Sequence, residues 1–178
     1  MHMTVFTDDW GTRFERDMIA VRWANLILAI VAVLPPLAHL LELPNKLVLD
    51  GSLWLAVQQH LYRGWGPFLG GPTEIGALAT TLLLLVRRRR LGRTRRLTIL
   101  AAAAYAGMLA AFFVFNEPVN AAVNAWTPAT LPSNWANYRL RWEAGHALAA
   151  VFSLIGLMAL IRSYLIETTE DQKAQTNT

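Results

Sequence analysis

The 178-residue chain contains no cysteine, so disulfide bonds, iron–sulfur clusters and thiolate metal ligands are all excluded. Charged residues are also scarce, at 16%, whereas 54% of the residues are hydrophobic and the mean hydropathy is +0.33. Any metal ion would have to be held by histidine, carboxylate, amide or water. The length is that of a single domain.

Charge is nearly absent from four long segments, at about residues 23–41, 68–86, 97–115 and 144–161. Each has 18 or 19 residues, so a helix of that length crosses the roughly 30 Å hydrocarbon core of a bilayer. The sequence therefore predicts an all-α integral membrane four-helix bundle. Residues 1–167 would form the single transmembrane domain in the lipid bilayer, and residues 168–178 a disordered C-terminal tail.

Positive charge is concentrated in one short connection, residues 87–96, which holds seven arginines. A basic loop between two membrane spans is typical of the cytoplasmic side, so binding of nucleic acid is not expected. Four spans then put both termini in the cytoplasm as well. We expect a multi-pass protein of the cell (inner) membrane, with residues 43–67 and 117–143 on the outer side.

Four glutamates stand at the ends of four different apolar segments, and two of them lie three residues from a histidine in His39-x-x-Glu42 and Glu143-x-x-His146. Residues three apart lie on one face of a helix. Ionisable groups in or beside membrane helices are costly and mark function by default. The predicted topology puts all of these residues at a similar depth near the outer face.

This pattern is typical of di-metal carboxylate bundles, which use single glutamates from two helices and a Glu-x-x-His pair from each of the other two. The sequence predicts a site for one or two transition-metal ions (iron, copper, manganese or zinc), with these ligands: His39, Glu42, Glu74, Glu117, Glu143 and His146. Alternatively, the same side chains face interfacial water, and Arg139 and Arg141 pair with the nearby glutamates.

The outer-side aromatic residues, including Trp135 and Trp142, fit either an interfacial belt or the wall of a pocket for a flat substrate. Asn116 and Asn120 share a helical face and could hydrogen-bond across the bundle. His60 could lean over the site or lie on the surface. The inner halves of the spans show few polar residues besides serine, threonine and tyrosine, which argues against a transport path.

Two stretches carry a family resemblance: residues 112–126, with Asn116-Glu-Pro-Val-Asn120, and residues 135–146, with Trp135, Arg139, Trp142 and His146. They resemble the anthrone oxygenase-like family of small four-helix membrane proteins, most of uncharacterised function. Characterised members oxidise an anthrone to an anthraquinone with dioxygen, and their activity has often been ascribed to the protein without a cofactor. The resemblance implies that the six named residues are counterparts of the family motif.

The first hypothesis is a membrane oxidoreductase, in effect a monooxygenase, which acts on a small hydrophobic, aromatic substrate at the metal site near the outer membrane face. Its catalytic residues would be His146, Glu143 and Arg139, with Arg139 binding an anionic oxygen. Its substrate contacts would be Asn116, Asn120, Trp135, Trp142 and His60.

Three alternatives stay open. One is a cofactor-free anthrone-type oxygenase with a histidine or glutamate base. The second is a haem-type electron carrier with His39 and His146 as axial ligands. The third is a non-enzymatic membrane binding module. A homo-oligomer is also open, because the run Ala101–Ala104 could pack helices within one chain or between chains.

Overall fold

The computed structural model describes residues 7–87 and 92–176, and this part of the chain is helical, without a β-strand. Four helices in it are long and apolar enough to cross a membrane, which confirms the all-α, four-span prediction and indicates a multi-pass membrane protein. The first is α1 (Thr7–Leu47) and the last is α6 (Trp135–Thr176). Between them lie α3 (Gly71–Arg87) and α4 (Arg93–Ala111).

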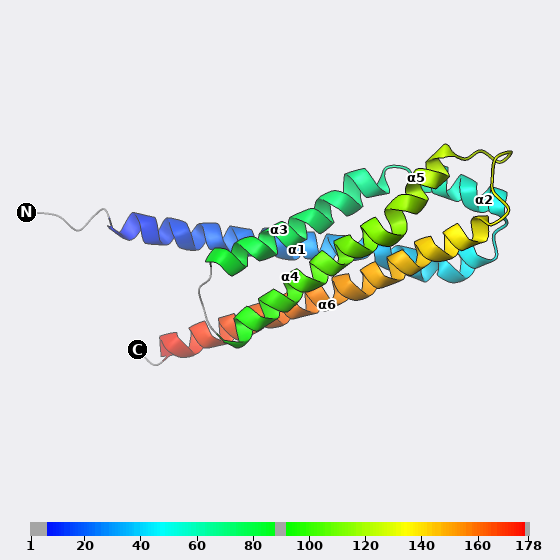
Figure 1. Ribbon diagram of the computed structural model, residues 1–178. Helices are drawn as coiled ribbons and strands as arrows, with labels where there is room; N and C mark the ends of the chain where they lie inside the picture. Colours follow the sequence, from blue (N-terminus) through cyan, green and yellow to red (C-terminus); the bar gives the residue numbers. More distant parts are fainter. Residues whose placement is uncertain (1–6, 88–91, 177–178) are drawn as a thin grey trace, which may run out of the picture.

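The four helices form a closed ring in which α1 packs against α3 and α6, and α4 packs against the same two helices. Figure 1 shows α1 beginning and α6 ending at one end of the bundle, here called the terminal end. The short helices α2 (Gly51–Ala56) and α5 (Glu117–Ala125) lie at the other, here called the α5 end. Alanines from all four helices fill the centre of the bundle, which lets the backbones approach closely.

Regular helix gives way to π-helical turns at three places in the chain. They are η1 (Val57–Leu61), η2 (Gly66–Gly70) and η3 (Phe112–Asn116). The chain nevertheless stays helical through η3 into α5 despite Pro118, because proline is tolerated in the first turn of a helix. Single-turn π-helical insertions are frequent at functional sites, so the α5 end is the place to look for one.

Helix α1 runs without a break through Pro35, Pro36 and Pro44. A proline has no backbone N–H, so each leaves the carbonyl four residues earlier without its usual donor. Membrane helices tolerate this because neighbouring helices supply other partners. The last proline lies two residues before Lys46, close to the polar cluster at the α5 end.

The C-terminal boundary differs from the expectation. Helix α6 continues to Thr176, so residues 168–176 are helical rather than a disordered tail. No glycine or proline follows Gly156 in the sequence, and glutamate, glutamine, lysine and alanine all favour a helix. Residues 177–178, and residues 88–91 of the arginine-rich connection, lie outside the described part of the chain.

The terminal half of the bundle interior is more polar than the sequence indicated. Asn25 of α1 is fully buried, and its Nδ2 donates to the hydroxyls of Thr80 and Thr81 on α3, at 2.8 and 2.9 Å. The hydroxyl of Tyr164 on α6 donates to Asn25 Oδ1 at 2.6 Å. One amide therefore joins three of the four long helices.

An ion pair between Arg22 and Glu167 joins α1 to α6 in the same half, and the Glu167 side chain is buried. The expectation of few polar residues in the inner halves of the spans, besides serine, threonine and tyrosine, did not anticipate the role of Asn25. A single asparagine in an apolar run shows no repeating pattern in the sequence. The polarity of the bundle interior therefore no longer counts against a transport path.

Candidate functional site

Two histidines from different helices meet at the α5 end. His39 of α1 and His146 of α6 have ring centroids 4.2 Å apart, with the rings tilted by 47°. His39 is buried and His146 is partly buried. The indole of Trp142, one turn before His146, lies edge-on to both imidazoles, with centroid distances of 4.6 and 4.2 Å. The sequence predicted that these two histidines would come together.

Aromatic side chains from the segment between η1 and η2 close the other side of the pair. Tyr62 meets His39 edge-on at a centroid distance of 4.5 Å, and Trp65 lies 5.5 Å from His39. Tyr62 also stacks against Trp142 at 5.8 Å. The imidazoles thus lie in an aromatic enclosure built from α1, α6 and the first α5-end connection.

Three charged side chains lie against this enclosure. Lys46, in the last turn of α1, is 3% exposed and its Nζ donates to Glu143 Oε2 at 3.0 Å. The same ammonium lies 3.9 Å from Glu42 Oε2 and 4.9 Å from the centroid of the Trp142 ring. Glu42 also accepts a hydrogen bond of 2.5 Å from the Tyr62 hydroxyl. One cation is therefore shared by two carboxylates.

Two polar atoms in the cluster are buried but find no hydrogen-bond partner among the described residues: His39 Nδ1 and Glu143 Oε1. His39 Nδ1 lies 3.6 Å from Glu42 Oε2, too far for a hydrogen bond. Buried polar atoms are nearly always paired with protein or water, and each exception needs a physical reason. A bound molecule that contacts both atoms would supply the partners that they lack.

The amides of Asn116 and Asn120 fix the position of Trp142. Asn120 Oδ1 accepts a hydrogen bond of 2.9 Å from the indole Nε1, and Asn116 Nδ2 donates to the Trp142 carbonyl at 2.9 Å. Helix α6 can approach η3 this closely because residue 145 is glycine. A Cβ atom there would lie 2.7 Å from Phe115 Cβ and closer still to the Asn116 amide. The expected hydrogen bonds across the bundle are present, and they hold the enclosure wall.

Arg139 is engaged with backbone rather than with the cluster. Its Nη1 donates to the carbonyls of Lys46 and Leu49, at 3.1 and 2.9 Å, and so caps the end of α1. Its guanidinium lies 4.7 Å from the centroid of the Trp135 ring. In this structure Arg139 and Trp135 support the loop that follows Lys46. A role for Arg139 in binding an anionic oxygen stays a prediction.

Three candidate residues stand apart from the cluster. Glu117 and His60 are exposed. Glu74 lies in the first turn of α3, two residues before Gly76. Gly76 packs against Leu28, which is near the middle of α1 and eleven residues before His39. The prediction treated Glu74 as the start of its apolar run, although it is the seventh residue of that run.

The described residues do not assemble a metal site of the expected size. Within residues 7–87 and 92–176, no group of three or more histidine, aspartate or glutamate side chains is arranged to hold a metal ion. The cluster brings together only four of the six expected ligands: His39, Glu42, Glu143 and His146. The Lys46 ammonium lies near both Glu42 and Glu143, where the sequence predicted a metal ion.

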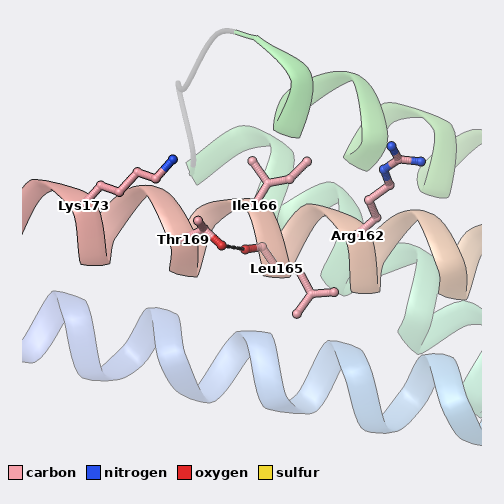
Figure 2. Close-up of a pocket in the computed structure, with 5 residues that line it drawn as sticks. All are labelled: Arg162, Leu165, Ile166, Thr169 and Lys173. Atoms are coloured by element: carbon pink, nitrogen blue, oxygen red, sulfur yellow. Dashed lines mark hydrogen bonds between the residues drawn. The ribbon is translucent and has the colours of Figure 1, made fainter.

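A hollow of about 340 Å³ lies far from this cluster, on α6 at the terminal end. Figure 2 shows its lining: Arg162, Leu165, Ile166, Thr169 and Lys173. The Thr169 hydroxyl donates to the Leu165 carbonyl at 2.9 Å, so it is already engaged. Its five lining residues include no histidine or carboxylate, unlike the cluster at the α5 end.

No family model, curated protein or solved structure matches this chain. The resemblance to anthrone oxygenase-like proteins therefore rests on residues 112–126 and 135–146 alone. Two findings do not depend on the resemblance. The chain is a multi-pass helical membrane protein, and an enclosed polar cluster lies at the α5 end. The sequence reasoning missed Lys46, Tyr62 and Trp65. A signal for Lys46 was available, since it follows Glu42 by four residues on the same face of α1.

Proposed function

We propose that the protein is a membrane oxidoreductase that removes a proton from a small, flat, hydrophobic substrate at the histidine pair, so that dioxygen oxidises the resulting anion. The observation that carries this proposal is the contact between His39 and His146 inside an aromatic enclosure. Imidazole is the side chain best suited to accept a proton near neutral pH. The resemblance to anthrone oxygenase-like proteins favours the same chemistry.

The cluster offers a group for each step of such a reaction. His39 Nδ1, which lacks a partner among the described residues, accepts the proton from an acidic C–H beside a carbonyl. The Lys46 ammonium stabilises the enolate oxygen that forms, and the rings of Tyr62 and Trp142 hold the flat body. Overall, a CH₂ group and O₂ become a carbonyl group and water, which balances without another oxidant.

A transition-metal ion bound by the histidine pair is a second candidate. The unpartnered atoms His39 Nδ1 and Glu143 Oε1 favour it, because both are good ligands for iron, copper, manganese or zinc. Lys46 counts against it, since a dication close to Glu143 would lie beside an ammonium group 3.0 Å from the same carboxylate. Elemental analysis of detergent-purified protein separates the two candidates.

Two further hypotheses have less support. Axial histidines bind opposite faces of a haem, but these two rings contact each other. If the cluster had a purely structural or binding role, replacing the histidines in folded protein would not change substrate turnover. We further propose that the terminal end is cytoplasmic and that the site opens toward the outer leaflet of the cell membrane, as the arginines of residues 87–96 favour.

The test is conversion of anthrone to anthraquinone, followed by absorbance, with purified protein in detergent. We expect turnover by the wild type and at least a hundredfold loss in His39→Ala and in His146→Ala, because each loses a member of the pair. Arg95→Ala, at the terminal end, should keep full activity. If the histidine variants fold and turn over like the wild type, the proposal is wrong.

A further inference from the structure

Lys46 has an environment unlike that of the other lysine in the chain. The sequence contains only two lysines, Lys46 and Lys173. Lys173 is exposed in the last turns of α6, whereas Lys46 is 3% exposed and lies inside the bundle. A buried lysine in a membrane protein is costly, and such residues are by default functional. The oxidation proposed above needs only its charge, not its nucleophilic nitrogen.

The groups around Lys46 Nζ are those that imine chemistry requires. Glu143 Oε2 accepts a hydrogen bond from it at 3.0 Å, and Glu42 Oε2 lies 3.9 Å away. The other oxygen of Glu143 is buried and has no partner among the described residues. A desolvated lysine with an adjacent proton acceptor is the arrangement that makes the amine a nucleophile toward carbonyl compounds.

The remaining surroundings select the carbonyl compound. The rings of Trp142 and Tyr62 lie 4.9 and 5.7 Å from Lys46 Nζ, so a carbon attached to this nitrogen would enter an aromatic enclosure. Glu42 is partly exposed, with 39% of its side chain accessible, and marks the side from which a molecule can reach the lysine. Flat, hydrophobic molecules that dissolve in the bilayer fit both features.

We propose that Lys46 is a covalent binding site for hydrophobic aldehydes, which it captures as a protonated imine. The ammonium gives a proton to Glu143, the free amine attacks the aldehyde carbon, and the C–N bond forms. The aldehyde oxygen then leaves as water, taking up the proton from Glu143 and one from nitrogen. The sum is R–NH₃⁺ plus R′–CHO giving R–NH⁺=CH–R′ plus H₂O, with no oxidant or reductant consumed.

The two carboxylates also account for the persistence of the product. The protonated imine keeps the positive charge of the ammonium, so Glu143 and Glu42 remain its counter-ions at the same place. The imine chemistry does not require the proposed oxidation, because it uses Lys46 nitrogen as a nucleophile and needs neither histidine as a base, although both reactions would share Lys46 and the same enclosure.

The experiment treats the folded, detergent-purified chain with 2-naphthaldehyde and sodium cyanoborohydride near neutral pH. Reduction converts each imine to a stable amine, which intact-mass measurement counts and peptide mapping locates. Lys173 is the control within the same molecule, since it sees the same reagents without the enclosure. We expect labelling at Lys46 to be at least tenfold faster than at Lys173, and at least tenfold slower in Glu143→Gln.

Two variants sharpen the result. Lys46→Arg keeps the positive charge beside Glu143 but cannot form an imine, so it should lose the fast label, whereas Lys173→Arg should keep it. Without the reductant, the wild type and Lys173→Arg should show a red-shifted naphthyl absorbance that Lys46→Arg lacks. Equal labelling of the two lysines, or an unlabelled Lys46 in folded wild-type protein, would overturn the proposal.

Discussion

The individual residue on which the α5 end depends most is Lys46. Its ammonium neutralises Glu143, which is 5% exposed, and lies within ion-pair distance of Glu42. Breaking a buried ion pair by removing one partner leaves an uncompensated charge, which is far more costly than never having had the pair. The cluster therefore depends on this lysine for its stability as well as for any chemistry.

Lys46→Met should lower the free energy of unfolding by about 3–5 kcal/mol, because the buried Glu143 carboxylate loses its counter-ion. The double variant Lys46→Met, Glu143→Leu should recover most of that loss. Unfolding of the detergent-solubilised protein, followed by circular dichroism, measures both. Lys173→Met serves as the matched control and should match the wild type. A Lys46→Met protein as stable as the control would mean that the pair contributes nothing.

At the residue scale the sequence predicted part of the cluster. The spacing of His39 with Glu42 and of Glu143 with His146 correctly indicated four side chains that the structure brings together. Tyr62 and Trp65 could not be predicted, because they come from a connection whose path depends on the π-helical turns on either side. No periodic pattern in the sequence specifies such a turn.

At the scale of elements, the position of α6 is set by glycines that let its neighbours approach. Gly145 faces Phe115 and Asn116 at η3, and a Cβ at Gly156 would lie 2.7 Å from the ring of Tyr105 on α4. Both contacts are too close for an alanine without movement of a neighbour. The register of α6 against α4 and η3 therefore determines where Trp142 and His146 stand.

Gly145→Ala should destabilise the protein by roughly 1–3 kcal/mol, as overpacking of a filled interface does. It should also reduce turnover, because α6 must shift and carry His146 with it. Gly66→Ala is the matched control, since a Cβ there meets nothing within 4 Å. Thermal unfolding and the anthrone assay report the two effects. If both alanine variants behave alike, the close approach at Gly145 has no importance.

The hydrogen bonds of Asn25 at the terminal end also hold separate helices together. Asn25→Leu removes hydrogen bonds to Thr80, Thr81 and Tyr164, and should destabilise the protein by about 1–2 kcal/mol, given the modest strength of hydrogen bonds between membrane helices. Turnover per folded molecule should be unchanged, since the network lies at the opposite end from the histidine pair. Asn124→Leu, at an exposed position, is the control in the same unfolding measurement. A loss of turnover in folded Asn25→Leu would instead link the two ends.

Sequence reasoning was reliable for the existence of the helices and unreliable for their depth and ends. Four apolar runs identified four long helices, because an uncharged run of about twenty hydrophobic residues is typical of a membrane-spanning helix. The depth of Glu74 was misjudged because it is the seventh residue of the run 68–86 and not its first. The end of α6 was misjudged because polar residues were taken as disorder, although they favour a helix.

The whole molecule is a bundle with a small-residue centre and a polar cluster at each end. The central core contains buried alanines from all four long helices, packed together with Tyr105, Met108 and Leu160. The two clusters differ in kind. The hydrogen bonds of Asn25 at the terminal end are satisfied by its neighbours, whereas the α5 end has unpartnered atoms among the described residues and an aromatic enclosure.

The orientation of the whole molecule can be tested directly, because the chain has no cysteine of its own. Single cysteines at Arg95 and at Asn134 place a thiol at the terminal end and in the connection between α5 and α6. We expect a membrane-impermeant maleimide to label Asn134→Cys in intact cells, and Arg95→Cys only after the membrane is permeabilised, as the positive charge near Arg95 requires. The reverse pattern would invert the proposed topology.

The central claim is that the histidine pair at the α5 end performs oxidation without a metal. Oxygen uptake by chelator-treated protein with anthrone as the substrate tests it most directly, with the His39→Ala, His146→Ala double variant measured beside the wild type. The account predicts uptake of one O₂ per anthrone by the wild type and none above the detergent background by the folded double variant. No uptake by the folded wild type, or equal uptake by both proteins, would contradict it.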